Sequence, residues 1–141
     1  MFLRNIARPL LASWFIYGGV ESIIDPEHRA ARSGKLVEPA LKEVGLDEVP
    51  TSLLVQVHGV ATVAAATALA FSKTPKTSAT ALGLLAAVTA VAGRPFWLEE
   101  PGHAREAGRE AFLKNISLLG GVMIAATAGN SRKRRKATKK R

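Results

Sequence analysis

The chain has 141 residues, enough for a single domain, and 20 basic against 11 acidic residues give it a formal net charge of +9. It contains no cysteine, which excludes disulfides, thiolate nucleophiles and cysteine-ligated metal or iron–sulfur centres. Any redox chemistry would therefore depend on a bound cofactor or on a partner.

The charged residues are segregated along the chain. Between Glu48 and Lys73, and again between Lys76 and Arg94, there is no Asp, Glu, Lys or Arg. A helix on the surface of a soluble protein would carry polar residues along one face. A soluble four-helix bundle is the alternative, but a run such as VATVAAATALAF offers no polar face to water. The pattern therefore favours membrane-spanning helices.

Four segments are predicted to cross a bilayer, at about residues 5–24, 52–71, 77–98 and 112–129, because spans need roughly 17–25 mainly apolar residues. Arg4 and Arg8 before the first segment are also typical of a secretory signal peptide, but no Ala-x-Ala-like site follows. We therefore interpret this segment as an uncleaved span. The expected fold class is all-α: a membrane four-helix bundle within residues 1–130, followed by a basic tail at 131–141.

The segments between the spans differ in length. Residues 25–50 are too long for a turn, and their mixed charges and apolar residues predict amphipathic surface helices interrupted at Gly34 and Pro39. Residues 99–111 predict a short charged helix. Residues 72–76 predict a tight turn, so that the second and third spans are antiparallel neighbours.

The distribution of Lys and Arg predicts the orientation. With the N-terminus inside, the inner segments hold two basic residues at the start, two in the tight turn and eight in the tail, and no acidic residue. The outer segments hold ten of the eleven acidic residues. We therefore expect a multi-pass protein of the bacterial cytoplasmic membrane with both termini cytoplasmic.

The basic tail has two possible interpretations. The first is a nucleic-acid-binding arm. The second, which we favour because the tail directly follows a predicted span, is attraction to anionic lipid, at about 1 kcal/mol per basic residue. We expect membrane lipids rather than nucleic acid as the partner of Arg132, Lys133, Arg134, Arg135 and Lys136.

Small residues are placed for close helix packing. Thr62, Ala66 and Ala70 recur at four-residue spacing, and paired glycines occur at 18–19 and 120–121. Such residues let helix backbones approach closely in lipid.

Five polar residues in the outer half of the predicted bundle are the candidate site: Glu21, His58, Arg94, Lys114 and Asn115. Polar groups in a membrane are costly unless they are paired or functional. Since the five come from all four spans, they could converge on one outward-facing cavity. An acid, an imidazole and cations suit an anionic or quinone-like head group, or proton transfer to one. A purely structural network, with the cations snorkelling to the interface, is the alternative.

Other chemistry is weakly indicated. His103 and Glu106 are spaced as a two-ligand metal site, but a solvated helix explains them as well. No nucleotide-binding glycine loop and no Ser/His/Asp spacing stands out. We expect no metal and no evident cofactor, with quinone as the one candidate.

Three blocks of sequence carry a resemblance to a known family. They are RPLLA at 8–12 with GG at 18–19, RPFW at 94–97 with EE at 99–100, and FLKN at 112–115 with LLGG at 118–121. With these blocks the chain resembles the DoxX family of small four-span bacterial membrane proteins, especially its actinobacterial branch. Ala111 stands where relatives often have His, and His58–Gly59 where they often have Asn–Gly.

The resemblance implies a role beside redox enzymes. The DoxX family is associated with quinol oxidase and thiosulfate:quinone chemistry, and its actinobacterial members with complexes that handle oxidative stress. It therefore implies a non-catalytic accessory or anchor subunit of a redox complex, with soluble or membrane redox proteins, or a second copy of the chain, as partners. The alternative is a quinone-interacting oxidoreductase subunit with an outward-facing polar site.

Overall fold

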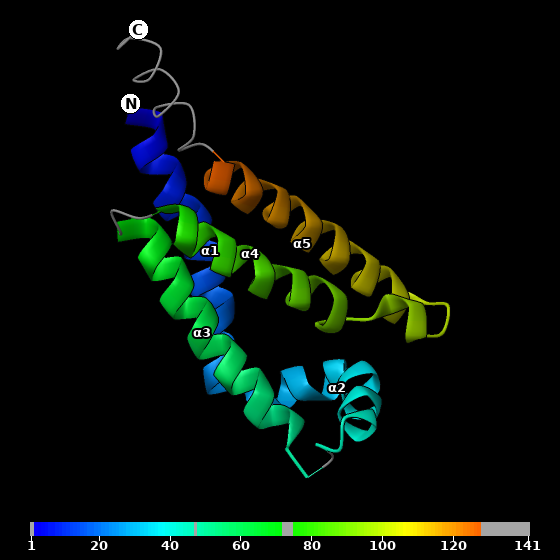
Figure 1. Cartoon of the computed structure of the whole chain (residues 1–141). Coiled ribbons are helices and arrows are strands. Elements are labelled where there is room, and N and C mark those ends of the chain that lie inside the picture. Colours follow the sequence, from blue (N-terminus) through cyan, green and yellow to red (C-terminus); the bar gives the residue numbers. More distant parts are fainter. Residues whose placement is uncertain (1, 47, 72–74, 128–141) are drawn as a thin grey trace, which may run out of the picture.

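The computed structural model describes residues 2–46, 48–71 and 75–127, and this part of the chain is all-helical (Figure 1). The all-α prediction is therefore confirmed. The tight turn expected at 72–76 lies partly outside the described residues, and the basic tail lies wholly outside them. The elements are α1 (Phe2–Ile24), α2 (Pro26–Glu43), α3 (Thr51–Phe71), α4 (Pro75–Ala92), the short 3-10 helix η1 (Phe96–Leu98) and α5 (His103–Thr127).

Two segments within the described residues are long and apolar enough to cross a membrane. They are Thr51–Phe71, with a mean hydropathy of 1.7, and Lys76–Leu98, with a mean hydropathy of 1.5. The first is α3, and the second contains α4 and η1.

Three helix boundaries differ from the sequence-based expectation. α2 is one continuous helix through Gly34 and Pro39, although its ribbon bends along its length (Figure 1). α4 ends at Ala92, before the helix-breaking Pro95. The charged segment expected at 99–111 is not a separate helix, because α5 begins at His103 and continues without a break into the fourth apolar segment.

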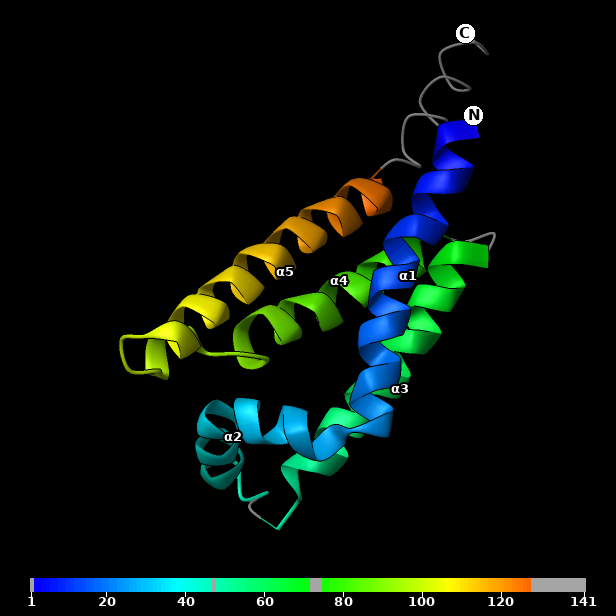
Figure 2. The ribbon, with the colours of Figure 1, turned by 180° about the vertical axis from the view of Figure 1, so that it is seen from behind.

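Helices α1, α3, α4 and α5 form two pairs. α1 packs mainly on α3, and α4 packs mainly on α5, while α3 and α4 join the pairs. Figures 1 and 2 show the pairs close together near the N-terminus of α1 and diverging toward α2, which lies at the open end. Small residues dominate the shared core, which consists of Ala12, Phe15, Ala66, Leu69, Ala79, Leu82, Ala86 and Val122.

The contact between α1 and α5 is limited. A Cβ added at Gly121 of α5 would lie 3.4 Å from Cδ1 of Leu11, so the two helices touch at this level. Toward α2 the ribbons of α1 and α5 separate (Figure 1).

The α1–α3 pair crosses on two glycines. A Cβ at Gly19 would lie 2.9 Å from the carbonyl oxygen of Gly59, and a Cβ at Gly59 would lie 2.8 Å from the carbonyl oxygen of Gly19. Neither position has room for a larger residue without moving the opposite backbone. The expected close approach at the 18–19 pair is thus made by Gly19, whereas Gly18 faces another direction, with Arg29 as its neighbour.

α2 is folded back sharply from the end of α1. Asp25 caps α2 by accepting a hydrogen bond from the backbone N–H of His28 at 3.3 Å, and Pro26 occupies the first turn. Farther along α2, Lys35 forms an ion pair of 2.9 Å with Glu99, beyond η1. This ion pair joins α2 to the segment that follows η1, across 64 residues of sequence.

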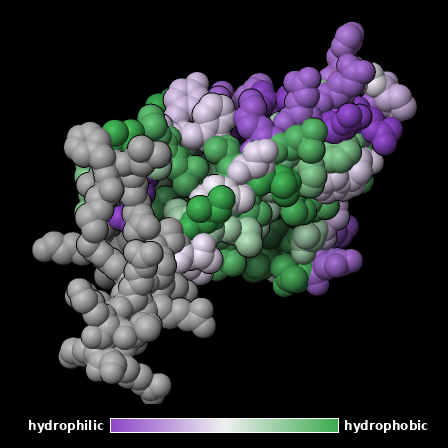
Figure 3. Space-filling model, turned by 90° about the horizontal axis from the view of Figure 1, so that it is seen from above, coloured by the Kyte–Doolittle hydropathy of each residue, from purple (hydrophilic) through white to green (hydrophobic). Residues whose placement is uncertain are grey.

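The surface is rich in exposed apolar side chains. Leu10, Ile24, Phe71 and Ile124 are between 67% and 82% exposed. Figure 3 shows hydrophobic residues over much of the face seen from above, with hydrophilic residues gathered toward one end.

We expect Gly59→Ala to lower the stability of the protein by about 1–3 kcal/mol, because the added methyl group overpacks the α1–α3 crossing. Thermal unfolding in detergent measures the change. Gly120→Ala is the matched control: a Cβ there meets nothing within 4 Å, and alanine should stabilise α5 by up to about 1 kcal/mol. Equal effects at both positions would contradict the close crossing.

Candidate functional site

A cavity of about 590 Å³ lies between the two helix pairs at their diverging end. Its lining comes from α1, α2, α3, α4, α5 and the segment after α4. The structure brings together in this lining all five residues singled out from the sequence, namely Glu21, His58, Arg94, Lys114 and Asn115. Phe15 and Ala86 belong both to the buried core and to the cavity lining, so the core forms the floor of the cavity.

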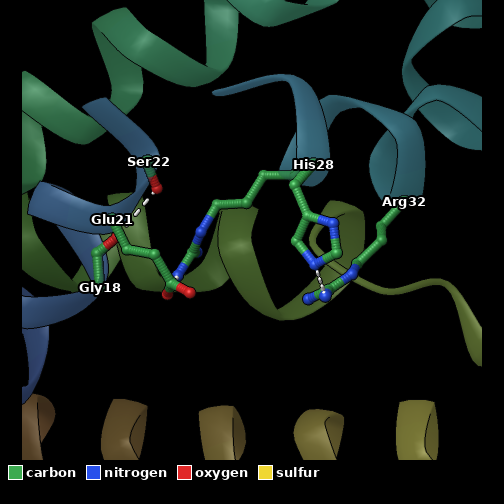
Figure 4. A network of polar contacts seen from close by, with 6 residues as sticks. Gly18, Glu21, Ser22, His28 and Arg32 are labelled. Atoms are coloured by element: carbon green, nitrogen blue, oxygen red, sulfur yellow. Dashed lines mark hydrogen bonds and ion pairs between the residues drawn. The ribbon is translucent and has the colours of Figure 1, made fainter. Parts of the chain in front are cut away.

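The corner between α1 and α2 holds the first polar pair. Arg29 of α2 donates from Nη2 to the Glu21 carboxylate of α1. The side chain of Glu21 is 47% exposed and that of Arg29 is 30% exposed, so the pair lies in the cavity wall rather than in the core. Figure 4 shows this corner, where Glu21 and Arg32 extend toward the same side.

Nε of Arg29 is left without a partner. Among the described residues it is the one buried side-chain nitrogen or oxygen that makes no hydrogen bond. Buried polar groups are almost always paired, so an unpaired donor calls for an explanation. Here it lies on a residue that lines a cavity.

Arg32 brings a second guanidinium from α2. Its Nη2 contacts Nε2 of His28, one helical turn away (Figure 4). Burial lowers the pKa of the Arg32 guanidinium, and the positive charges of Arg94 and Arg29 lower it further, against the opposing effect of Glu21 and Asp25. Arginine nevertheless stays charged in proteins. Three guanidinium groups are therefore close enough to repel one another.

His58 links α3 to α4. Its Nε2 lies 2.9 Å from Oγ1 of Thr89. The Thr89 hydroxyl also donates to the carbonyl oxygen of Leu85 at 3.1 Å. Because the hydroxyl proton is used there, the remaining arrangement is donation from Nε2–H of His58 to Oγ1.

Arg94 is positioned by the packing of η1 on α5. The rings of Phe96 and Phe112 have centroids 5.5 Å apart, and Trp97 meets Phe112 edge-on at 6.3 Å. A Cβ at Gly108 would lie 2.8 Å from Cβ of Phe96, so glycine there permits the close approach. The segment after α4 is thereby fixed against α5, with Arg94 in the cavity lining.

Lys114 of α5 and Trp14 of α1 meet across the space between their helices. Nζ of Lys114 lies 5.3 Å from the centroid of the Trp14 ring, a cation–π distance. Trp14 is 45% exposed and neighbouring Tyr17 is 66% exposed, and both line the cavity. The cavity lining therefore combines exposed aromatic side chains with charged ones.

Arg29, Arg32, Ser33 and Thr89 also line the cavity, but the sequence did not single them out. Arg29, Arg32 and Ser33 have the spacing i, i+3, i+4 that puts side chains on one face of a helix. That spacing indicates that the three side chains share one face of α2. The sequence does not indicate the direction in which α2 folds back toward the other helices.

The remaining sequence candidates lie elsewhere. Nδ1 of His103 is 3.7 Å from a carboxylate oxygen of Glu106, and both side chains are largely exposed. The described residues contain no group of three or more His, Cys, Asp or Glu side chains that could hold a metal. The lipid-binding residues proposed in the tail, 132–136, lie outside the described part of the chain.

Comparison with protein-family models, with curated proteins and with solved structures finds no match for this chain. The resemblance to the DoxX family thus rests on the sequence blocks alone, and the function has to be proposed from the geometry.

We expect Thr89→Val to lower stability by about 1 kcal/mol, because it leaves Nε2 of His58 without its partner between α3 and α4. Thermal unfolding in detergent measures the loss. Thr80→Val is the matched control, since the exposed Thr80 hydroxyl donates within its own helix, to the carbonyl oxygen of Lys76. A loss no greater than that of the control would contradict an interhelical role for His58.

Proposed function

We propose that the chain is a four-span integral membrane protein that binds a small lipid-soluble ligand in the cavity between its helix pairs. The observation that carries this proposal is the joining of Glu21, His58, Arg94, Lys114 and Asn115 in one cavity lining, within a molecule whose other helix faces expose large apolar side chains.

The exposure of the apolar helices supports a lipid environment. Only 22% of each of the two apolar segments is buried inside the protein, whereas the core helix of a soluble protein would be mostly buried. Exposed Val57 and Val60 on α3 and Leu84 and Val91 on α4 would meet water in a soluble protein. In a bilayer they meet lipid tails.

Helices α1 and α5 are proposed as the other two spans. Residues 9–20 of α1 and 115–127 of α5 carry no Asp, Glu, Lys or Arg. Glu21 and Lys114, which border these stretches at the outer end, line the cavity and so need not face lipid. Arg8 borders the other end of α1, where a long side chain reaches the interface. Charge on α1 and α5 is thus compatible with crossing the bilayer.

The proposed orientation places both termini in the cytoplasm and α2 on the outer side of a bacterial cytoplasmic membrane. This follows from the excess of Lys and Arg in the inner segments. The cavity then lies in the outer half of the bilayer, and the space between α1 and α5 faces the lipid.

The kind of ligand follows from the walls of the cavity. Aromatic and aliphatic side chains such as Phe15, Tyr17, Leu54 and Val55 surround a few convergent polar groups, as in most small-molecule sites. An amphiphile with a polar head and an apolar tail fits this arrangement. The two candidate types of ligand are quinones and lipids.

The orientation is testable because the chain has no native cysteine. In intact cells, an impermeant thiol reagent should label Glu43→Cys, just beyond the proposed outer surface, without lysis. It should label Ser131→Cys only after the membrane is opened. The reverse pattern would overturn the orientation, and extraction of the protein without detergent would overturn membrane insertion.

The ligand site is testable by filling the cavity. A Cβ at Gly18 meets only the Arg29 guanidinium, at 3.8 Å, so Gly18→Leu should fold while its side chain occupies the cavity. We expect a lipid-soluble compound to be extractable from the purified protein, and at least about tenfold less of it from Gly18→Leu. Gly120→Leu is the matched control, because Gly120 has open space around it. Equal amounts from all three proteins would contradict the site.

A second function, an accessory subunit of a redox complex, is favoured by Val44 and Leu46. They are 68% and 51% exposed and lie outside the proposed spans, where lipid tails would not cover them. This proposal also rests on the DoxX resemblance. Affinity purification from native membranes in mild detergent would support it through a stoichiometric redox protein that is lost with Val44→Ser and Leu46→Ser together. A protein recovered without any partner would count against it.

A further inference from the structure

We propose that the ligand of this cavity is an anionic amphiphile, whose oxyanion head group is held by the guanidinium groups of Arg29, Arg32 and Arg94. This inference rests on the proposed function and specifies the charge of the ligand: a phosphate- or carboxylate-type head rather than a neutral quinone ring.

The charges in the cavity lining are unbalanced. Arg29, Arg32, Arg94 and Lys114 carry four positive charges, and Glu21 is the one carboxylate among the lining residues. Like charges in a partly buried site repel strongly, because the low local dielectric weakens screening. An anionic head group removes this repulsion, whereas a neutral ligand leaves it in place.

One donor at this corner lacks a partner. Glu21 occupies Nη2 of Arg29, and Nε of Arg29 is buried without a hydrogen bond, so an oxyanion that reached it would satisfy it. Guanidinium groups present forked N–H donors that match the oxygens of carboxylates and phosphates, and such charge-assisted hydrogen bonds are the strong ones. A quinone carbonyl accepts hydrogen bonds but brings no negative charge.

The cavity lining also offers apolar contacts for a tail. Trp14 and Tyr17 of α1 line the cavity while remaining 45% and 66% exposed, and Lys114 of α5 lies over the Trp14 ring. Leu54 and Val55 of α3 add an aliphatic wall. A head group beside α2 and a tail running past Trp14 would use both parts of the cavity.

Glu21 then acts as a competitor of the ligand. Its carboxylate holds Arg29 in the empty cavity, and an incoming oxyanion takes over that role. Removing the Glu21 charge should therefore tighten the binding of an anion. A Glu21 that served only to hold the α1–α2 corner would not produce this gain.

Intrinsic fluorescence provides a local signal. The chain has two tryptophans, so Trp97→Phe leaves Trp14, in the cavity lining, as the sole reporter. In a nonionic detergent this variant is titrated separately with dodecyl phosphate, dodecanol, inorganic phosphate and a decyl-substituted benzoquinone. We expect saturable binding of dodecyl phosphate that weakens with salt, and much weaker binding of the other three probes.

Three variants test the role of each charge. Arg32→Gln and Arg94→Gln should each weaken dodecyl phosphate binding about tenfold, and Glu21→Gln should tighten it by about threefold. Arg105→Gln, which removes a charge from α5 outside the cavity lining, should leave it unchanged. Melting temperature and elution profile establish that each variant is folded, and the expected gain with Glu21→Gln cannot come from misfolding.

The contrary outcomes bear on different parts of the proposal. Saturable, Gly18→Leu-sensitive binding of the benzoquinone but not of dodecyl phosphate would overturn the anionic head and keep the proposed ligand site. Inorganic phosphate binding as tightly as dodecyl phosphate would overturn the amphiphile. Dodecyl phosphate affinity unchanged in Arg32→Gln, Arg94→Gln and Glu21→Gln would overturn the guanidinium site. Absence of binding by every probe would count against both the inference and the proposed function.

Discussion

The close crossing of α1 and α3 at Gly19 and Gly59 is the contact on which the rest of the structure depends. A Cβ at either glycine would lie within 3 Å of the opposite carbonyl oxygen, so the two backbones come close together at this point. Ser22 of α1 is thereby held against Gly59 of α3. α4 and α5 form the second closely packed pair. The diverging pairs leave the cavity between them.

Charge is concentrated where the helices diverge. α2 folds back from the Asp25 cap and adds Arg29 and Arg32 to the lining that Glu21, Arg94 and Lys114 share. A charged side chain facing lipid tails would be costly, and the cavity offers these five a polar environment instead. The same arrangement leaves the positive charges only partly compensated by Glu21, and this imbalance is the basis of the proposed ligand site.

The sequence predicted most of the helices and five of the cavity-lining residues, and it missed the contribution of α2 to the cavity. Charge-free runs predicted α3, α4 and the apolar parts of α1 and α5. The polar residues in the outer half of the predicted bundle, Glu21, His58, Arg94, Lys114 and Asn115, were expected to converge, and all five line the cavity. Arg29 and Arg32 were not predicted as site residues, because their distance from Glu21 depends on the fold of the α1–α2 corner. The interruptions expected at Gly34 and Pro39 do not occur, because α2 continues through both residues as one bent helix. The four-span bundle, its orientation and the DoxX resemblance remain predictions.

In the proposed site, α1 and α5 stand apart toward α2 and leave the cavity accessible from the bilayer. Spin labels in lipid nanodiscs test this separation directly, since the chain has no cysteine to remove. We expect a longer distance between labels at Val20→Cys and Leu113→Cys than between labels at Ser13→Cys and Gly120→Cys, near the Leu11–Gly121 contact. Equal distances, as in a closed bundle with helix axes about 8–10 Å apart throughout, would contradict it.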